Sequence, residues 1–272
     1  MNRGLLAKAV REWRLGTLVF GAALMAVEAL LALSLLQFQN QISALGSQIP
    51  VLQYALRAIL GATGTGRDIG PEMIGAIAWV HPVPLALVWA HVLIYCTRVP
   101  AGEVDRGTID ILLGLPVSRW QLWRAEMLVW LAAGATVLLM GLAGNVLGNL
   151  AVSGGLHTGL RRLAIIFVNG FCLYFAVGGL TWLASAASDR RGRAIAVPFA
   201  VVLASFLLAF LAPLWSPAEC VSFLSLLHYY APLAIIRDGV WPVRDMIVLL
   251  ACGGALWTAG GIVFARRDLS TL

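Results

Sequence analysis

Two histidines in one apolar stretch are the first residues that could do chemistry, because imidazole is a common ligand of haem iron and other metals. They are His81 and His91. Ten steps of about 100° place them on different turns and roughly opposed faces of a helix. The four cysteines include no C-x-x-C pair, which argues against a zinc site or a disulfide framework. We therefore expect no metal and no redox cofactor in this chain.

The sequence also contains no motif for nucleotide binding or for hydrolysis. The stretch Gly61–Arg67 is rich in glycine, but a phosphate-binding loop needs a lysine after its last glycine, and Lys8 is the only lysine. H-E-x-x-H and G-x-S-x-G are missing as well. The chain is therefore expected not to be an enzyme and to bind neither ATP nor Mg²⁺ itself.

Glu28 is the one clear acidic residue inside an apolar stretch. An unpaired charge at the centre of a membrane costs at least about 2.5 kcal/mol. Glu28 is therefore expected to be protonated and bonded to a neighbouring carbonyl, to pair with His81 at a similar depth on the next apolar stretch, or to contact a substrate. His81 precedes Pro82, where a kink and freed carbonyls make room for polar groups. The sequence slightly favours the protonated carboxyl and leaves the other two open.

A polar interval between two apolar stretches, residues 102–126, combines charged ends with an apolar middle. Thr108 is suited to begin a short helix there, and Gly114 with Pro116 to end it. Ser118-x-x-Gln121 has the pattern of a capping box that begins the next long helix. The short helix would offer apolar side chains on one face, which must contact a partner, the protein's own bundle or lipid headgroups. Those side chains are Ile109, Leu112 and Leu113.

The elements that carry these residues are membrane helices. Of the 272 residues 60% are hydrophobic and only 12% are charged, and the mean hydropathy is +0.88, which exceeds what a soluble core can bury. We predict one transmembrane domain over residues 1–272 that is an all-α integral membrane protein. Its six spans of near 20 residues are expected at about 15–37, 73–95, 127–150, 163–187, 194–214 and 246–265. Residues 1–14 are expected to form an amphipathic entry helix, and 38–72 and 215–243 to be outer segments with interfacial or re-entrant helices.

The basic residues predict the orientation. With the N-terminus inside, 13 of the 19 lysines and arginines fall in cytoplasmic segments and 6 in outer ones. This bias explains the net charge of +6 better than nucleic-acid binding does, because the charges are spread over short loops. We therefore expect a multi-pass protein of the plasma (inner) membrane with both termini in the cytoplasm and no nucleic-acid partner.

Three motifs resemble the type-2 ABC transporter permease family. Two are weak alone: Phe264–Leu269 at the chain end, and the stretch Leu224–Pro232 before the last span. The third is more specific and resembles the family's first cytoplasmic loop, Glu103-x-x-x-Gly107-Thr108-Ile109-Asp110-Ile111-Leu112-Leu113-x-Leu115-Pro116-Val117-Ser118-Arg119.

The resemblance implies the membrane subunit of an ATP-driven exporter. Its partners would be two copies of a cytosolic ABC ATPase, which would bind ATP and Mg²⁺, and a second permease chain in a homodimer or related heterodimer, within membrane lipid. It also implies that the ATPase contacts this loop, through Glu103, Arg106, Gly107, Thr108, Ile109, Asp110, Leu112, Leu113 and Pro116. Two other classes stay open: an ion-coupled secondary transporter, and a non-transporting membrane partner of an assembly or maturation ATPase. The sequence does not name the cargo.

Overall fold

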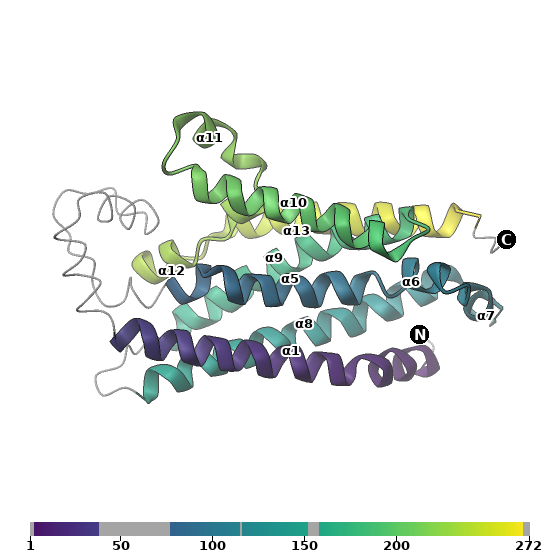
Figure 1. Cartoon of the computed structure of the whole chain (residues 1–272), viewed down its shortest axis with the longest axis horizontal. Helices are drawn as coiled ribbons and strands as arrows, with labels where there is room; N and C mark the ends of the chain where they lie inside the picture. The colour runs from purple at the N-terminus through teal and green to yellow at the C-terminus, as the bar shows by residue number, and fades with distance from the viewer. Residues whose placement is uncertain (1–2, 38–76, 115, 152–157, 269–272) are drawn as a thin grey trace.

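The protein is an elongated bundle of helices. The computed structural model describes residues 3–37, 77–114, 116–151 and 158–268 (Figure 1). The expected outer segment 38–72 lies outside these residues. Within the described part, the bundle helices are α1 (Arg3–Gln37), α5 (Pro82–Cys96), α8 (Arg119–Leu150), α9 (Leu160–Ala187), α10 (Arg191–Leu211) and α13 (Val243–Arg266).

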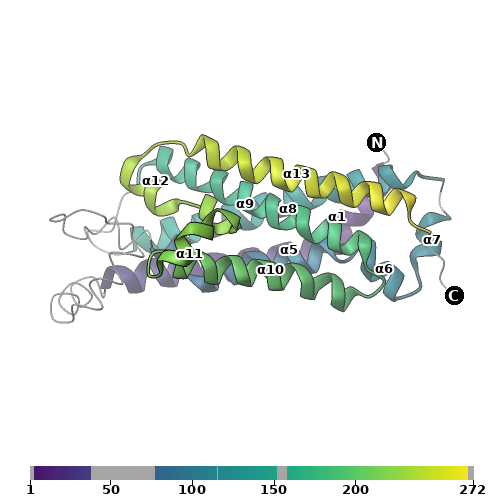
Figure 2. The ribbon, with the colours of Figure 1, turned by 90° about the horizontal axis from the view of Figure 1, so that it is seen from above.

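The bundle helices run lengthwise and alternate in direction (Figures 1 and 2). One end carries the start of α1 and the end of α13 together with two short helices, α6 (Ala101–Asp105) and α7 (Ile109–Leu113). We call this the α7 end. The opposite end carries α12 (Pro232–Asp238), and we call it the α12 end.

The helices have the composition of membrane spans, which confirms the expected all-α integral membrane fold. In the described residues, five helices are long and apolar enough to cross a membrane, namely α1, α8, α9, α10 and α13. The segment after α10 adds a sixth if its two parts, bent by 80° at Ser225, are taken as one span. The helix α5 is shorter, with 15 residues, so the predicted number of six spans stays a prediction.

Several boundaries differ from the expected ones. The expected entry helix and first span form one continuous helix of 35 residues, α1. The helix α8 begins at Arg119, eight residues before the expected start of the third span, because the capping box starts it there. The break at His81 and Pro82 follows a short described helical stretch, 77–80, so within the described residues it lies near the α12 end of this span.

Small residues let α1 and α8 approach closely. A Cβ added at Gly144 would overlap the backbone of Met25, and one at Gly148 would lie 2.6 Å from the carbonyl oxygen of Ala29. Close backbone approach at small residues is how membrane helices gain packing contacts in lipid. The G-x-x-x-G pattern of α8 therefore fixes α1 against it.

A buried histidine joins four helices. His91 is 0% exposed on α5, and its Nε2 accepts a hydrogen bond of 3.2 Å from the indole N–H of Trp13 on α1. Its Nδ1 lies 3.2 Å from the hydroxyl of Tyr174 on α9, and that hydroxyl donates to the carbonyl of Trp130 on α8 at 3.3 Å. Since Nε2 accepts, a neutral ring carries its proton on Nδ1 and donates it to Tyr174. His91 is thus a structural residue of the bundle.

The stretch between α10 and α13 folds back over the α12 end. It contains α11 (Ser216–Val221), two short 3-10 helices, Ser222–Leu224 and Leu226–Tyr229, and α12. Asn169 of α9 holds it on both sides of Tyr230, because its amide donates to the carbonyl of Tyr229 and accepts from the N–H of Ala231, both at 3.1 Å. The Leu224–Pro232 stretch is therefore fastened to the bundle through its backbone.

Candidate functional site

The two short helices α6 and α7 project at the α7 end, between α5 and α8 in the chain (Figure 1). They cover residues 101–113 and so correspond to the first half of the expected loop 102–126. The backbone reverses between them at Gly107, whose φ of 68° lies in the left-handed region that glycine adopts without strain. The motif glycine is therefore explained by the turn.

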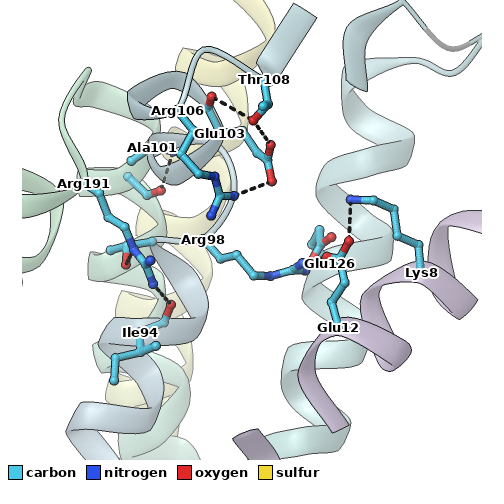
Figure 3. Close-up of polar contacts among 12 residues, drawn as sticks. Lys8, Glu12, Ile94, Arg98, Ala101, Glu103, Arg106, Thr108, Glu126 and Arg191 are labelled. Carbon is cyan, nitrogen blue, oxygen red and sulfur yellow. Dashed lines mark hydrogen bonds and ion pairs between the residues drawn. The ribbon is translucent and has the colours of Figure 1, made fainter. Parts of the chain in front are cut away.

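Glu103 organises this turn from the inside (Figure 3). Its side chain is mostly buried, and its Oε1 pairs with the guanidinium of Arg106 at 2.7 Å. Its Oε2 accepts from the hydroxyl of Thr108, and its backbone carbonyl accepts from the Thr108 N–H at 2.9 Å. The expected cap by the Thr108 side chain is not formed, because that hydroxyl is bound to Glu103 instead. Both Glu103 oxygens hold the turn together.

The apolar face of α7 is turned differently from the expected way. Ile109 is 0% exposed and Leu112 is 6% exposed, and Leu112 belongs to the hydrophobic core of the bundle, with Leu113 packed against it. Ile111 is 74% exposed. The interpretation that Ile109 and Leu112 offer themselves to a partner is therefore wrong for this structure, since the protein's own bundle covers them. They anchor α7 to the bundle. The outward apolar residue is Ile111, which was not among the predicted contact residues.

The outward surface of this segment is consequently small and mixed. Its exposed residues in the described part are Asp105, Arg106, Gly107, Asp110, Ile111, Gly114 and Pro116. One apolar side chain rimmed by charged residues of both signs is a composition typical of protein contact surfaces.

Hydrogen bonds fasten α6 to α9 and to the end of α5, and Arg191 links α10 to that same end (Figure 3). The N–H of Ala101 donates to Ser185 of α9 at 3.2 Å. Arg191, at the start of α10, donates to the carbonyl of Ile94 at 3.1 Å and to the hydroxyl of Thr97 at 3.4 Å, both at the end of α5. The N–H of Gly102 also donates to the carbonyl of Thr97 at 2.9 Å, so a displacement of α6 is carried directly to α5 and α9 and, through Arg191, to α10.

A buried ion network lies next to this attachment. Arg98 follows α5 and contacts the carboxylates of Glu12 on α1 and Glu126 on α8 (Figure 3). Lys8 pairs with Glu12 at 3.0 Å, and the hydroxyl of Tyr95 donates to Glu126 at 3.3 Å. Arg98 and Glu126 are 8% and 3% exposed. The contacts of Arg98 with these two acids were not predicted from the sequence, because the acids lie 86 and 28 residues away in the chain.

The remaining motif residues join helix ends. Ser118 and Gln121 form the expected capping box, with bonds of 3.0 and 3.2 Å. The guanidinium of Arg119 donates to the carbonyl of Phe264 at 3.0 Å near the end of α13, where a cation is favourable. Arg267 in turn donates to the carbonyl of Ala186 on α9 at 2.9 Å. These arginines connect α8, α9 and α13 at the α7 end.

Glu28 has a partner other than those considered from the sequence. It is 2% exposed on α1, and its Oε2 accepts a hydrogen bond of 3.0 Å from the side-chain amide of Asn145 on α8. His81 instead precedes the first turn of α5, where its Nδ1 accepts from the N–H of Val83 at 3.3 Å. The structure therefore does not form the Glu28–His81 pair. The sequence feature that could have indicated this partner is Asn145, a polar residue inside the third predicted span.

No group of three or more metal-ligating side chains occurs in the part of the chain that the structure describes. Comparison with curated proteins gave no match. The model of one protein family, described as "ABC-2 family transporter protein", matches residues 7–266. That range contains the bundle from the second turn of α1 onward, with α6, α7 and the fastened outer stretch. The chain therefore belongs to the ABC-2 family of transporter proteins.

Proposed function

We propose that this permease is driven by a separate ATPase subunit that binds the outward surface of α6 and α7. The observation that carries the proposal is Ile111, an isoleucine that is 74% exposed on a five-residue helix whose other apolar residues pack onto the bundle. Such a side chain gains from burial against another protein, by about 25 cal/mol per Å² of apolar surface. The segment beneath it is firmly held, which preorganises the contact.

Motion of this surface would reach the bundle by two routes. The contacts of α6 lead to α5 and α9 and, through Arg191, to α10, and Arg98 leads to α1 and α8. Closure of an ATPase dimer against this surface would thus move the ends of these helices together. The transport path would then open to the other side of the membrane. The chain itself contributes no hydrolytic chemistry, and ATP and Mg²⁺ are assigned to the partner.

The assembly we propose contains two ATPase subunits and two permease chains, as a homodimer or a related heterodimer, and works as an exporter. The outward apolar faces of several bundle helices support a lipid environment and a second chain. Co-purification tests the ATPase: a tagged permease is expected to bring down a soluble P-loop protein whose ATP turnover depends on the permease. The proposal is contradicted if an intact permease, purified from cells that make both proteins, never retains such a protein.

The α7 end is proposed to face the cytoplasm of a cell bounded by a plasma (inner) membrane. Basic side chains of the described residues gather there, from Arg3, Lys8, Arg11 and Arg14 on α1 to Arg266 at the end of α13 and Arg267 directly after it. This is the positive-inside bias. Reporter fusions after Leu272 and at residues 158–160 are expected to report opposite sides, with the first in the cytoplasm. The same side for both would contradict the topology.

A further inference from the structure

A groove lies on the outside of the bundle between α1 and α8, which run side by side in the same direction from the α7 end (Figure 1). Residues 6–18 of α1 and 128–136 of α8 line it, and its free space is about 520 Å³. The groove is open to the surroundings, because Val10, Leu18 and Leu128 of its wall are about half exposed. At roughly 1.5 Å per residue, its α1 side is about 18 Å long, which suits an extended chain better than a compact ligand.

The groove arises because side chains on both helices leave this part of the α1–α8 contact unfilled. Trp13 of α1 turns toward α5, where its indole N–H donates to the buried histidine at 3.2 Å. On α8 the wall includes Ala132 and Ala133, whose small side chains leave space. The hydroxyls of Thr17 and Thr136 donate to backbone carbonyls of their own helices, at 3.2 and 2.9 Å. These parts of the wall therefore present an apolar surface.

Arg14 is the only charged residue among the described residues that line this groove. Its side chain is exposed, and within the described part of the chain it makes no hydrogen bond or ion pair. Lys8, by contrast, is paired with Glu12 at 3.0 Å. A guanidinium offers five N–H donors in a planar fork that matches a phosphate group. The groove thus combines an apolar wall with one free group for an anion.

Arg14 also lies at the level of α1 where charged residues stop. Residues 15–27 carry no charge, and neither do residues 127–150 of α8. An arginine at such a boundary extends its guanidinium to the headgroups while its stem contacts hydrocarbon. Basic pockets between membrane helices bind anionic lipid headgroups. The part of the groove beyond Arg14, at Leu18 and Thr136, then faces the hydrocarbon layer.

We propose that this groove binds a phospholipid with an anionic headgroup, in the leaflet at the α7 end. The headgroup phosphate pairs with Arg14, and one acyl chain lies along the groove toward Leu18 and Thr136. Packing against the wall holds the chain, and the charge of Arg14 selects an anionic lipid over a zwitterionic one. The site belongs to the permease alone, so it does not depend on ATPase docking and can be measured without it.

Lipid binding to the purified, delipidated permease in detergent tests the site. The probes are dioleoyl phosphatidylglycerol and dioleoyl phosphatidylcholine, which have the same chains and differ in net charge, and native mass spectrometry measures the first lipid to bind. The wild type is expected to prefer the anionic lipid about fivefold, as one basic residue near a membrane surface provides. Arg14→Gln is expected to lose most of that preference. The matched control is Arg193→Gln, at an exposed arginine of α10 that does not line the groove, and it is expected to keep the preference.

A second variant tests the groove without touching the arginine. Ala132 is exposed in the groove wall, so Ala132→Phe is expected to fold and to weaken binding of both lipids by filling the space. Ala200→Phe is its control, because Ala200 is exposed on α10 and does not line the groove.

The proposal is overturned if the wild type binds both lipids equally, or if Arg14→Gln keeps the preference or loses no more of it than Arg193→Gln does. It is equally overturned if Ala132→Phe leaves lipid binding at the wild-type value. If Ala132→Phe in that case also converts a dimer into a monomer, the occupant of the groove is a second permease chain.

Discussion

Replacing Ile111 with aspartate is expected to release the ATPase while leaving the permease folded. The side chain is 74% exposed, so the isolated permease gains no buried charge from the change. In the complex, the aspartate would lose its water at the centre of the contact. Central residues of such contacts are worth about 2 kcal/mol or more, which corresponds to an affinity roughly 30-fold lower. Titration of the ATPase onto immobilised permease measures the change, and transport-linked ATP turnover is expected to fall with it.

The matched control for this variant is Val240→Asp. Val240 is 64% exposed and follows α12 at the opposite end of the bundle, where no ATPase contact is proposed. It is expected to keep wild-type affinity. Leu112→Asp is a poor probe of docking, because Leu112 is buried in the core and a charge there would destabilise the permease itself. Unaltered ATPase affinity in Ile111→Asp would place the docking surface elsewhere.

Removal of Arg98 is expected to cost the permease about 3–5 kcal/mol of stability, because Arg98→Ala leaves the buried carboxylate of Glu126 without its cation. Thermal unfolding of the purified protein in detergent measures the loss. Replacing both partners, with Arg98→Met and Glu126→Met, is expected to recover most of it, since neither charge then remains buried.

The neighbouring ion pair provides the comparison. Arg106 pairs with Glu103 at 2.7 Å, but its side chain is 53% exposed. Arg106→Ala is therefore expected to cost less than Arg98→Ala, because Thr108 still bonds the Glu103 carboxylate after the change. Equal losses in Arg98→Ala and Arg106→Ala would show that burial of the Arg98 network contributes nothing.

The sequence predicted those features that depend on local patterns. Apolar length and basic bias indicated a membrane bundle, and Ser118 with Gln121 indicated the start of α8, because a capping box is complete within four residues. The short helix α7 and its end at Gly114 also followed from neighbouring residues.

Features that depend on contacts between distant parts of the chain could not be predicted from the sequence. The sequence shows that Ile109, Ile111 and Leu112 are apolar, but their direction on so short a helix depends on how α6 is fastened to α5 and α9. The partner of Glu28 likewise depends on the register of α1 against α8, which the glycines of α8 determine. Neither contact has a local signature.

The unbroken length of α1 has a consequence for depth in the membrane. Its 35 residues extend about 52 Å at roughly 1.5 Å per residue, whereas the hydrocarbon layer is about 30 Å thick. If the ion network at Glu12 marks one boundary of that layer, Glu28 lies about 24 Å further along the helix axis. The carboxyl would then sit within about 6 Å of the opposite boundary, in the far leaflet. The buried carboxyl is therefore close to the headgroup layer at the α12 end and away from the membrane centre, where an uncompensated charge would cost most.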